Sequence, residues 1–468
     1  MNDRPSDTHG AAARRSFSNI DEATVWDDPT YLRGEILTDA LLQEHAGALA
    51  RAHGKPTTQG SARPLRRRFL ETRQLIQRAY ASLAQGAERK RDPSPAELWL
   101  LDNSHVVEGQ LREIEEDLPW GYLVELPRMS RGPMKGYPLV YGLCLDYLRH
   151  TDCHLDLGAL ARFVDAYQRE RVLTIGELWA IPIMLRLGLV LAVGALAVSE
   201  ARADDRDLAE QWALNLLGPS AVSPAPVTAA RREALARLLR SHKQQPSDAF
   251  LVTLLKRLRE REDAPAEAID WIANQTARLQ ATPDELARRY HVRQAADQVS
   301  VGNAITSMRS INSVDWSEFF RATSHVEAVL ARDPIGVYAR QDDATRDRCR
   351  HAVERLARSA RRSEMDVART ALGLAEYCAG APEEYRAHVG YYLLDEGRGE
   401  LQAALAHRPP FHRWFGELVE RRPGLFYLGP LALGTVGLAL LAWFGLSLVQ
   451  VPLVVRVLVT PALLLAAS

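Results

Sequence analysis

A long apolar stretch near the C-terminus is the feature that most constrains this chain. Residues 425–449 contain no charged side chain and would form about 37 Å of helix, enough to cross a hydrocarbon layer of about 30 Å with some tilt. Residues 453–467 form a second apolar stretch, interrupted by Arg456, whose guanidinium can reach the interface from near a helix end. The pattern predicts a transmembrane helical hairpin, with a buried core hairpin as the alternative. Four arginines precede the first stretch and place that side in the cytoplasm: Arg408, Arg413, Arg421 and Arg422.

A second apolar stretch, residues 173–198, has a different character. Glu177, Pro182 and Arg186 interrupt it, and the charge-free part, residues 187–198, would span only about 18 Å as a helix. This is too short for a bilayer, so the stretch predicts a pair of buried helices at the centre of a globular domain. Because an unpaired buried charge is costly, we expect Glu177 and Arg186 to have partners.

The starts of helices are easy to recognise. Residues 94–97 (SPAE) and 282–285 (TPDE) are capping boxes with proline at the first helical position, and residues 174–177 (TIGE) are a weaker version. After Ser94, apolar residues at helical spacing predict one helix that Pro119 ends. Alternation typical of strands is nearly absent. The predicted fold class is all-α: a multi-helix cytosolic bundle followed by the C-terminal hairpin.

Changes in composition suggest how the chain is divided. Residues 218–227 (GPSAVSPAPV) read as a linker, and the N-terminal residues are rich in polar and small side chains. The predicted segments are a mostly mobile arm (1–63), a helical subdomain (64–218), a linker-rich connection (219–248), a second helical subdomain (249–422), and a transmembrane helix with the start of a second (423–468).

Charge and cysteine content exclude several classes of protein. The net charge of −1 offers no overall field for nucleic acid. The N-terminus lacks an apolar segment after a basic start, so no signal peptide is predicted. The cysteines show no zinc-binding spacing and read as core residues in a reducing compartment: Cys144, Cys153, Cys349 and Cys378.

Common catalytic motifs are missing from the sequence. It contains no phosphate-binding glycine loop, no nucleophile elbow and no H-E-x-x-H metal pair. Asp205 and Asp207 form a D-x-D triplet of the type that holds a metal and a nucleotide diphosphate, but the helical context favours a solvated helix end. We therefore assign no catalytic, cofactor-binding or metal-ligating residue and expect no cofactor in this chain.

Three detailed stretches, residues 120–138, 333–348 and 388–398, combine glycines, aromatic residues and charged residues in arrangements more specific than helix packing requires. The first could stack a sugar or dock a neighbouring domain, with a packed connection as the alternative. The second suggests an ion-pair network between helices, and the third a packed helix end or a site without a nucleophile. With the charged apolar stretch, they give these candidate interface or glycan contacts: Trp120, Tyr122, Tyr137, Glu177, Trp179, Arg186, Tyr338, Arg340, Arg346, Asp347, His388, Tyr391, Tyr392, Asp395 and Glu396.

These stretches also carry a resemblance to a known family. From about residue 65 to residue 468, the chain resembles the N-terminal region of bacterial cyclic β-1,2-glucan synthases, which are large inner-membrane enzymes. The similar blocks are ELWLLDN (97–103), REIEEDLPWGY (112–122), TIGELWAIPIMLRL (174–187), VDWSEFF (314–320), DPIGVYAR (333–340), TRDRCRHAVE (345–354) and HVGYYLLDEGR (388–398). The resemblance implies a helical region, membrane helices, and then a transferase domain that uses UDP-glucose and a divalent metal.

The sequence ends within the second apolar stretch, so we expect it to be the front part of a longer polypeptide and no family catalytic residue falls on it. The leading hypothesis is a membrane-anchoring and domain-docking segment of such a synthase, located at the bacterial inner membrane with its helical part cytoplasmic. Its expected partners are membrane lipid and a downstream transferase domain. The alternatives are a free-standing scaffold for a separate synthase subunit, or a helical domain that binds β-1,2-glucan in a cleft.

Overall fold

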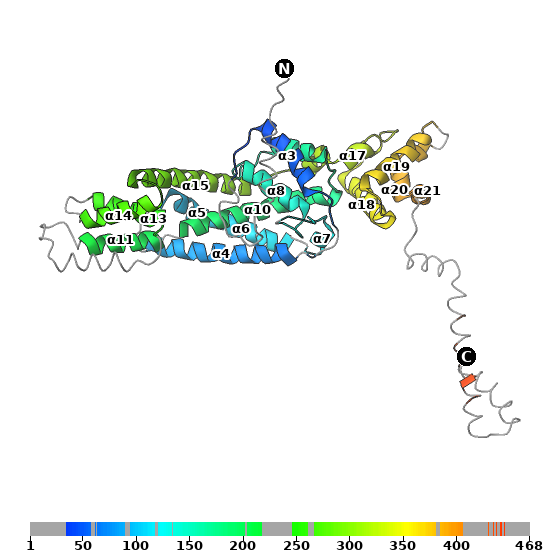
Figure 1. Cartoon of the computed structure of the whole chain (residues 1–468). Helices are drawn as coiled ribbons and strands as arrows, with labels where there is room; N and C mark the ends of the chain where they lie inside the picture. Colours follow the sequence, from blue (N-terminus) through cyan, green and yellow to red (C-terminus); the bar gives the residue numbers. More distant parts are fainter. Residues whose placement is uncertain are drawn as a thin grey trace, which may run out of the picture. The chain divides into compact units, whose positions relative to one another are not determined.

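Figure 1 shows the computed structural model of the chain, which divides into two compact units, Met1–His325 (unit 1) and Val326–Ser468 (unit 2). Its regular elements are helices, with isolated β-bridges as the only extended pairing among the residues described. The predicted all-α class is confirmed for that part of the chain. The structure describes residues 34–57, 61, 63–88, 94–117, 120–132, 134–201, 204–217, 246–260, 266–380 and 384–405, and residues 429, 434, 437, 440, 441 and 444.

Helix α10 (Ile175–Ala201) lies at the centre of unit 1. It packs most extensively against α4 (Arg63–Glu88) and α8 (Leu139–His150), and it also contacts α15 (Pro283–Ile311). In Figure 1, α10 runs between α4 and α15. Residues 175–198 of α10 are long and apolar enough to cross a membrane, but 72% of the most apolar window is buried inside the unit. The prediction of a buried core segment is confirmed.

The prediction of two helices in this segment is wrong, because α10 is continuous through Pro182. Proline inside a helix costs about 3 kcal/mol through a lost hydrogen bond and a steric clash. Burying one large apolar side chain contributes about 1.5–3 kcal/mol. Ile181 and Met184, on either side of the proline, have no exposed surface, so packing offsets the cost of keeping the helix unbroken.

The predicted C-terminal hairpin falls almost entirely outside the described residues. Between positions 425 and 467 only six residues are described, and each is helical. Helix α10 is the single candidate membrane span in the part of the chain that the structure describes. The structure therefore leaves the transmembrane hairpin unconfirmed.

The capping boxes occur where the sequence predicts them. Ser94 caps α5 (Pro95–Asp102) with Glu97 reaching back to its backbone, and Thr282 caps α15 in the same way. The single helix predicted after Ser94 is instead two helices, because Asn103 separates α5 from α6 (Ser104–Asp117). The side-chain amide of Asn103 donates to the Trp99 carbonyl and its oxygen accepts from Arg309 on α15, so a tertiary contact fixes the break. Leu118 and Pro119 lie outside the described residues.

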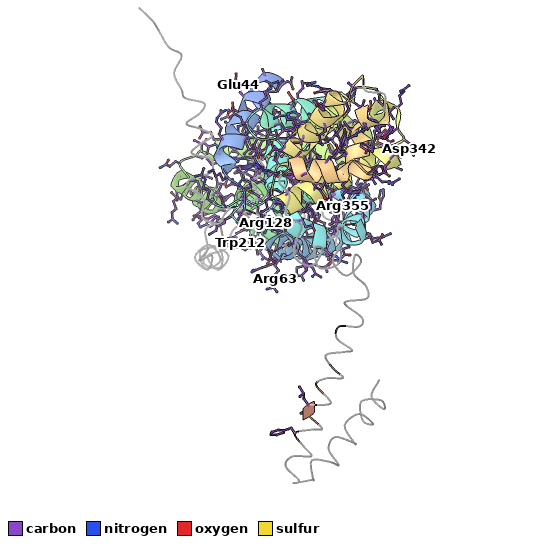
Figure 2. All side chains as sticks on the ribbon, turned by 90° about the vertical axis from the view of Figure 1, so that its right-hand side faces the viewer. Glu44, Arg63, Arg128, Trp212, Asp342 and Arg355 are labelled. Carbon is purple, nitrogen blue, oxygen red and sulfur yellow. The ribbon has the colours of Figure 1, made fainter. Side chains whose placement is uncertain are left out.

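Unit 1 contains a second hydrophobic core. It is formed by α11 (Asp204–Leu217), α13 (Asp248–Arg259), α14 (Ala266–Arg278) and part of α15. Trp212, labelled in Figure 2, packs edge-on against Phe250 and near Trp271. The helices before and after the predicted 219–248 connection thus pack together. Residues 218–245 are not among those described, and the predicted domain boundaries stay a prediction.

Part of the predicted N-terminal arm is folded. Helix α3 (Asp39–His53) packs against α9 (Leu157–Gln168) and α8, and buries Leu42, Ala46 and Leu49. These three residues recur at helical spacing and belong to a short amphipathic pattern around residues 31–49, although the composition of the arm favours a mobile segment. The remainder of the arm before Gly34 lies outside the described residues.

The first detailed stretch is a compact connection between α7 (Trp120–Glu125) and α8. Arg128, labelled in Figure 2, is fully buried and donates to three backbone carbonyls, those of Ser61, Leu123 and Gly136. Gly136 has a φ of 87°, a left-handed conformation that glycine adopts without strain. This arrangement supports the interpretation as a packed connection.

Unit 2 is built around a short helix, α20 (Val389–Leu394), which packs against α18 (Asp343–Ala360), α19 (Glu364–Tyr377) and α21 (Arg398–Ala404). The remaining elements are α17 (His325–Leu330), which begins at the last residue of unit 1, and the 3-10 turns η2 (Tyr338–Arg340) and η3 (Glu384–Ala387). Cys349 is buried in α18 and Cys378, after α19, is half-buried; neither forms a disulfide, and the same holds for the buried Cys144 and Cys153 of unit 1.

Candidate functional site

Asp333 organises the turn between α17 and η2 in unit 2. Its Oδ2 accepts from the backbone N–H groups of Val337 and Tyr338 and from Nδ1 of His388, and its Oδ1 accepts from the N–H of Val389. The side chain is buried, and burial raises the pKa of Asp333, but the hydrogen bonds from His388, Val389 and Tyr338 outweigh it and hold the pKa below its ordinary value. The second and third detailed stretches of the sequence thus meet at this carboxylate.

Glu327 is the centre of a buried network between α17 and α18. Its Oε2 accepts from the Tyr338 hydroxyl at 2.9 Å and from Arg350 Nε at 3.1 Å, and its Oε1 lies 3.7 Å from Arg346. Burial raises the pKa of Tyr338, so its hydroxyl stays protonated and donates. Arg350 also pairs with Asp347 at 2.8 Å. Arg346 and Asp347 of the predicted stretch take part in this network, but its centre, Glu327 and Arg350, lies outside that stretch.

Arg340 does not take part in an ion pair that the structure describes. It is exposed, and its guanidinium donates to the carbonyls of Ile335 and Gly336. It therefore closes the turn that Asp333 holds from the inside.

The third stretch has a buried and an exposed side. Tyr392 is fully buried and donates to the Leu374 carbonyl, whereas Tyr391 is half-buried and packs edge-on against Tyr385. Tyr385 is 56% exposed, and Asp395 and Glu396 lie exposed just after α20. This edge, made of Tyr385, Tyr391, Asp395 and Glu396, presents the Tyr385 ring and two carboxylates to solvent, whereas Arg386 lies over the Tyr391 ring.

Both predicted charges of α10 have partners. Glu177 has no exposed surface; it pairs with Arg171 at 3.0 Å and completes the capping box with Thr174. Arg186 pairs with Glu113 at 2.7 Å and donates to Asn312. Internal contacts thus account for both side chains.

Two of the aromatic candidates of unit 1 pack against other aromatic rings. Trp179 stacks on Phe320 with ring centroids 4.8 Å apart, and Tyr137 stacks on Tyr141 at 5.9 Å. Trp120 and Tyr122 are in α7, but their side chains lie outside the described positions.

One further group of polar side chains was missed by sequence reasoning. His45, Asp146 and His150 lie together in unit 1, each offering a ligand atom within 4.8 Å of the others, a grouping that could hold a metal ion. Asp146 and His150 are four residues apart on α8, which places both on one helix face. The spacing of Asp146 and His150 could have been recognised in the sequence. No sequence pattern indicated that His45, about a hundred residues earlier, lies beside them.

Comparison with known proteins gives one clear relationship. No protein-family model matches the chain. Over 392 residues it is 27% identical to the cyclic beta-(1,2)-glucan synthase NdvB of Rhizobium meliloti (strain 1021). The similarity supports a relation to cyclic β-(1,2)-glucan synthases. The matched region covers 83% of this chain but 13% of NdvB, so the chain spans a small part of that protein's length.

Proposed function

We propose that this chain is the N-terminal helical segment of a cyclic β-1,2-glucan synthase, which docks the catalytic domains and anchors them at the membrane. The polymerisation of glucose from UDP-glucose, with a divalent metal, takes place in domains outside this chain. The observation that carries the proposal is the extent of the similarity, which takes in most of this chain and a small share of the relative.

The internal use of polar groups supports a docking role over a catalytic one. Glu177, one of the candidate glycan contacts, is fully buried against Arg171. Glu327 and Asp333 are likewise occupied by hydrogen bonds within unit 2. A general acid or base must reach a substrate proton, and groups enclosed in this way do not.

The membrane-anchoring part of the proposal depends on residues 423–468. Their charge-free stretch has the length of a bilayer-spanning helix, and the arginines before it favour a cytoplasmic location for the helical units at the inner membrane of a bacterium.

A chimeric synthase tests the docking role. The matched segment of NdvB is replaced by this chain, and cyclic glucan made from UDP-glucose is measured in membranes. We expect the chimera to synthesise glucan and a synthase lacking the segment to be inactive. Changing Asp270→Asn in the chimera is the control, since this exposed carboxylate of α14 should leave the rate unchanged. Synthesis by the deleted enzyme, or turnover of UDP-glucose by this chain alone, would contradict the proposal.

Truncation tests the anchor. A chain ending at Arg422 should be recovered from the soluble fraction, and the full chain from membranes only with detergent. A truncated chain that still requires detergent would show that other residues hold it at the membrane. Co-purification with a separately encoded transferase would favour the free-standing scaffold instead.

The exposed edge of unit 2 favours a second candidate function, binding of β-1,2-glucan. Aromatic faces stack on sugars and carboxylates accept from their hydroxyls, and Tyr385 with Asp395 and Glu396 provides both. Calorimetry with β-1,2-glucan should then show heat that Tyr385→Ala removes. Tyr377, which is 89% exposed on α19, supplies the matched control as Tyr377→Ala. Absence of heat with the unaltered chain would eliminate this function.

A further inference from the structure

The cluster of His45, Asp146 and His150 joins two helices of unit 1. His45 comes from α3, and Asp146 and His150 from the last two turns of α8. His45 Nε2 contacts Asp146 Oδ2, and His150 Nε2 lies 3.9 Å from Asp146 Oδ1. Two imidazoles and one carboxylate therefore converge on a common point.

A backbone contact fixes the orientation of the His150 ring. The Nδ1 atom of His150 is 2.7 Å from the carbonyl oxygen of Glu35, which can only accept, so Nδ1 donates. In the neutral ring, Nε2 then keeps its lone pair and faces a carboxylate oxygen that is also an acceptor. A cation between the two atoms satisfies both. Metal-binding histidines characteristically donate their second ring nitrogen to a carbonyl in this manner.

The chain is shaped locally to make this contact. The N–H of Gly34 donates to the Arg149 carbonyl and that of Leu37 to the His150 carbonyl, so this segment lies against the end of α8. A Cβ at Gly34 would be 2.8 Å from Arg149 Cγ and 3.0 Å from the His150 ring. A side chain at position 34 would therefore require Arg149 or the His150 ring to shift, which would disturb the contact between the Glu35 carbonyl and His150.

We propose that His45, Asp146 and His150 form a binding site for a divalent first-row transition metal ion of the zinc class, which ties α3 to α8. Imidazole nitrogen and carboxylate oxygen suit such ions, and three protein ligands leave a fourth position of a tetrahedral ion open. In the contact with Asp146, His45 Nε2 donates to the carboxylate; to bind the ion, His45 takes the Nδ1–H tautomer, so that Nε2 presents its lone pair to the metal.

The distances and burial fit this assignment. Ligand atoms around a tetrahedral zinc ion lie about 3.4 Å apart, and the three atoms here lie within 4.8 Å of one another. Side-chain rotations that separate His45 from Asp146 and bring His150 closer would give this spacing. Asp146 is 5% exposed, whereas His45 and His150 keep 14% and 12% of their side-chain surfaces exposed. An ion can therefore enter from solvent and exchange its bound water molecules for these three mostly buried side chains.

The test uses the full chain in detergent, stripped of metal with a chelator and titrated with Zn²⁺ alone. We expect one equivalent to bind and to raise the thermal midpoint. His150→Gln and His45→Gln should each weaken zinc binding at least about tenfold. Losing a residue that only hydrogen-bonds to a metal ligand already weakens binding by about this factor, and these two residues are ligands themselves. His105→Gln is the matched control, because His105 is an exposed histidine of α6. Less than one equivalent bound, or equal weakening by the control, would overturn the site.

X-ray absorption of the zinc-loaded, unaltered chain tests the site without any variant, so a variant that fails to fold does not affect the result. The expected first shell holds two imidazole nitrogens at about 2.0–2.1 Å and a carboxylate oxygen. A sulfur shell, or a shell without imidazole, would place the ion elsewhere and overturn the proposal. A histidine–aspartate ion pair without metal is the competing explanation, and it predicts no stoichiometric zinc at all.

Discussion

Units 1 and 2 both bury charged side chains, but the charges have different structural roles. In unit 1, Glu177 and Arg186 lie within the mostly apolar residues 175–198 of α10, and Glu177 pairs with Arg171 only six residues away. In unit 2, Asp333 accepts from Val389, which is 56 residues away, and Glu327 joins α17 to α18. Apolar packing therefore defines unit 1, whereas buried carboxylates define the turn and helix contacts of unit 2.

The largest effect should come from a charge placed in the core of unit 1. Val193 on α10 has no exposed surface, so Val193→Asp should reduce the free energy of unfolding by more than about 4 kcal/mol, because no partner compensates the buried carboxylate. Urea unfolding followed by circular dichroism measures the loss. Val292→Asp on α15, where the valine is 64% exposed, should change stability by less than about 0.5 kcal/mol. Equal effects of the two changes would mean that α10 is not the core of unit 1.

The next effect probes the carboxylate network of unit 2. Glu327→Ala removes the acceptor of Tyr338 and Arg350 and should cost about 3–5 kcal/mol, since it breaks a buried ion pair. The control is Asp343→Ala, which removes an exposed partner of Arg346 and should cost about 0–1 kcal/mol. Hydrogen exchange of amides in α17 and α18 reports on this unit directly. A mild effect of Glu327→Ala would show that apolar packing dominates unit 2 as well.

The same difference explains what the sequence could predict. The capping boxes at Ser94 and Thr282 were predicted correctly because each cap satisfies groups three residues away. The partners of Glu177 and Arg186 were anticipated for an equally general reason, the cost of burying an unpaired charge. These features depend on local chemistry, which a single sequence contains.

Features that depend on distant partners could not be predicted. The break at Asn103 involves Arg309, about two hundred residues later, and the continuity of α10 through Pro182 depends on the helices around it. The candidate site followed the same rule: the stretches containing Asp333 and His388 each drew attention, but no pattern showed that these two side chains meet.

A third prediction uses pH to test unit 1. Burial lowers the pKa of His53 on α3 from 6.5 to about 4, and its Nδ1 contacts the Tyr167 hydroxyl at 2.8 Å. A lowered histidine pKa means that the unfolded chain binds the proton first, so stability is complete above pH 6.5 and falls as pH decreases toward 4. A shift of this size corresponds to about 3 kcal/mol. His53→Gln should remove this pH dependence, measured by urea unfolding at several pH values, and His105→Gln should not.

The smallest effect concerns Asp333 and lies in a different pH range. Asp333→Asn keeps the shape of the side chain but removes the charge that accepts from His388 and from two segments of backbone, and should cost about 2 kcal/mol at pH 7.

Because the folded pKa of Asp333 is lowered, its contribution to stability is present above the unfolded pKa of about 3.9 and is lost as pH falls through the folded pKa. The stability difference between the unaltered chain and Asp333→Asn, read from hydrogen exchange in η2 and α20, should therefore be constant from pH 7 to 5 and shrink only below about pH 4. A difference that already shrinks between pH 7 and 5 would mean that the stabilisation does not come from the Asp333 carboxylate, and would remove the contrast between the two units.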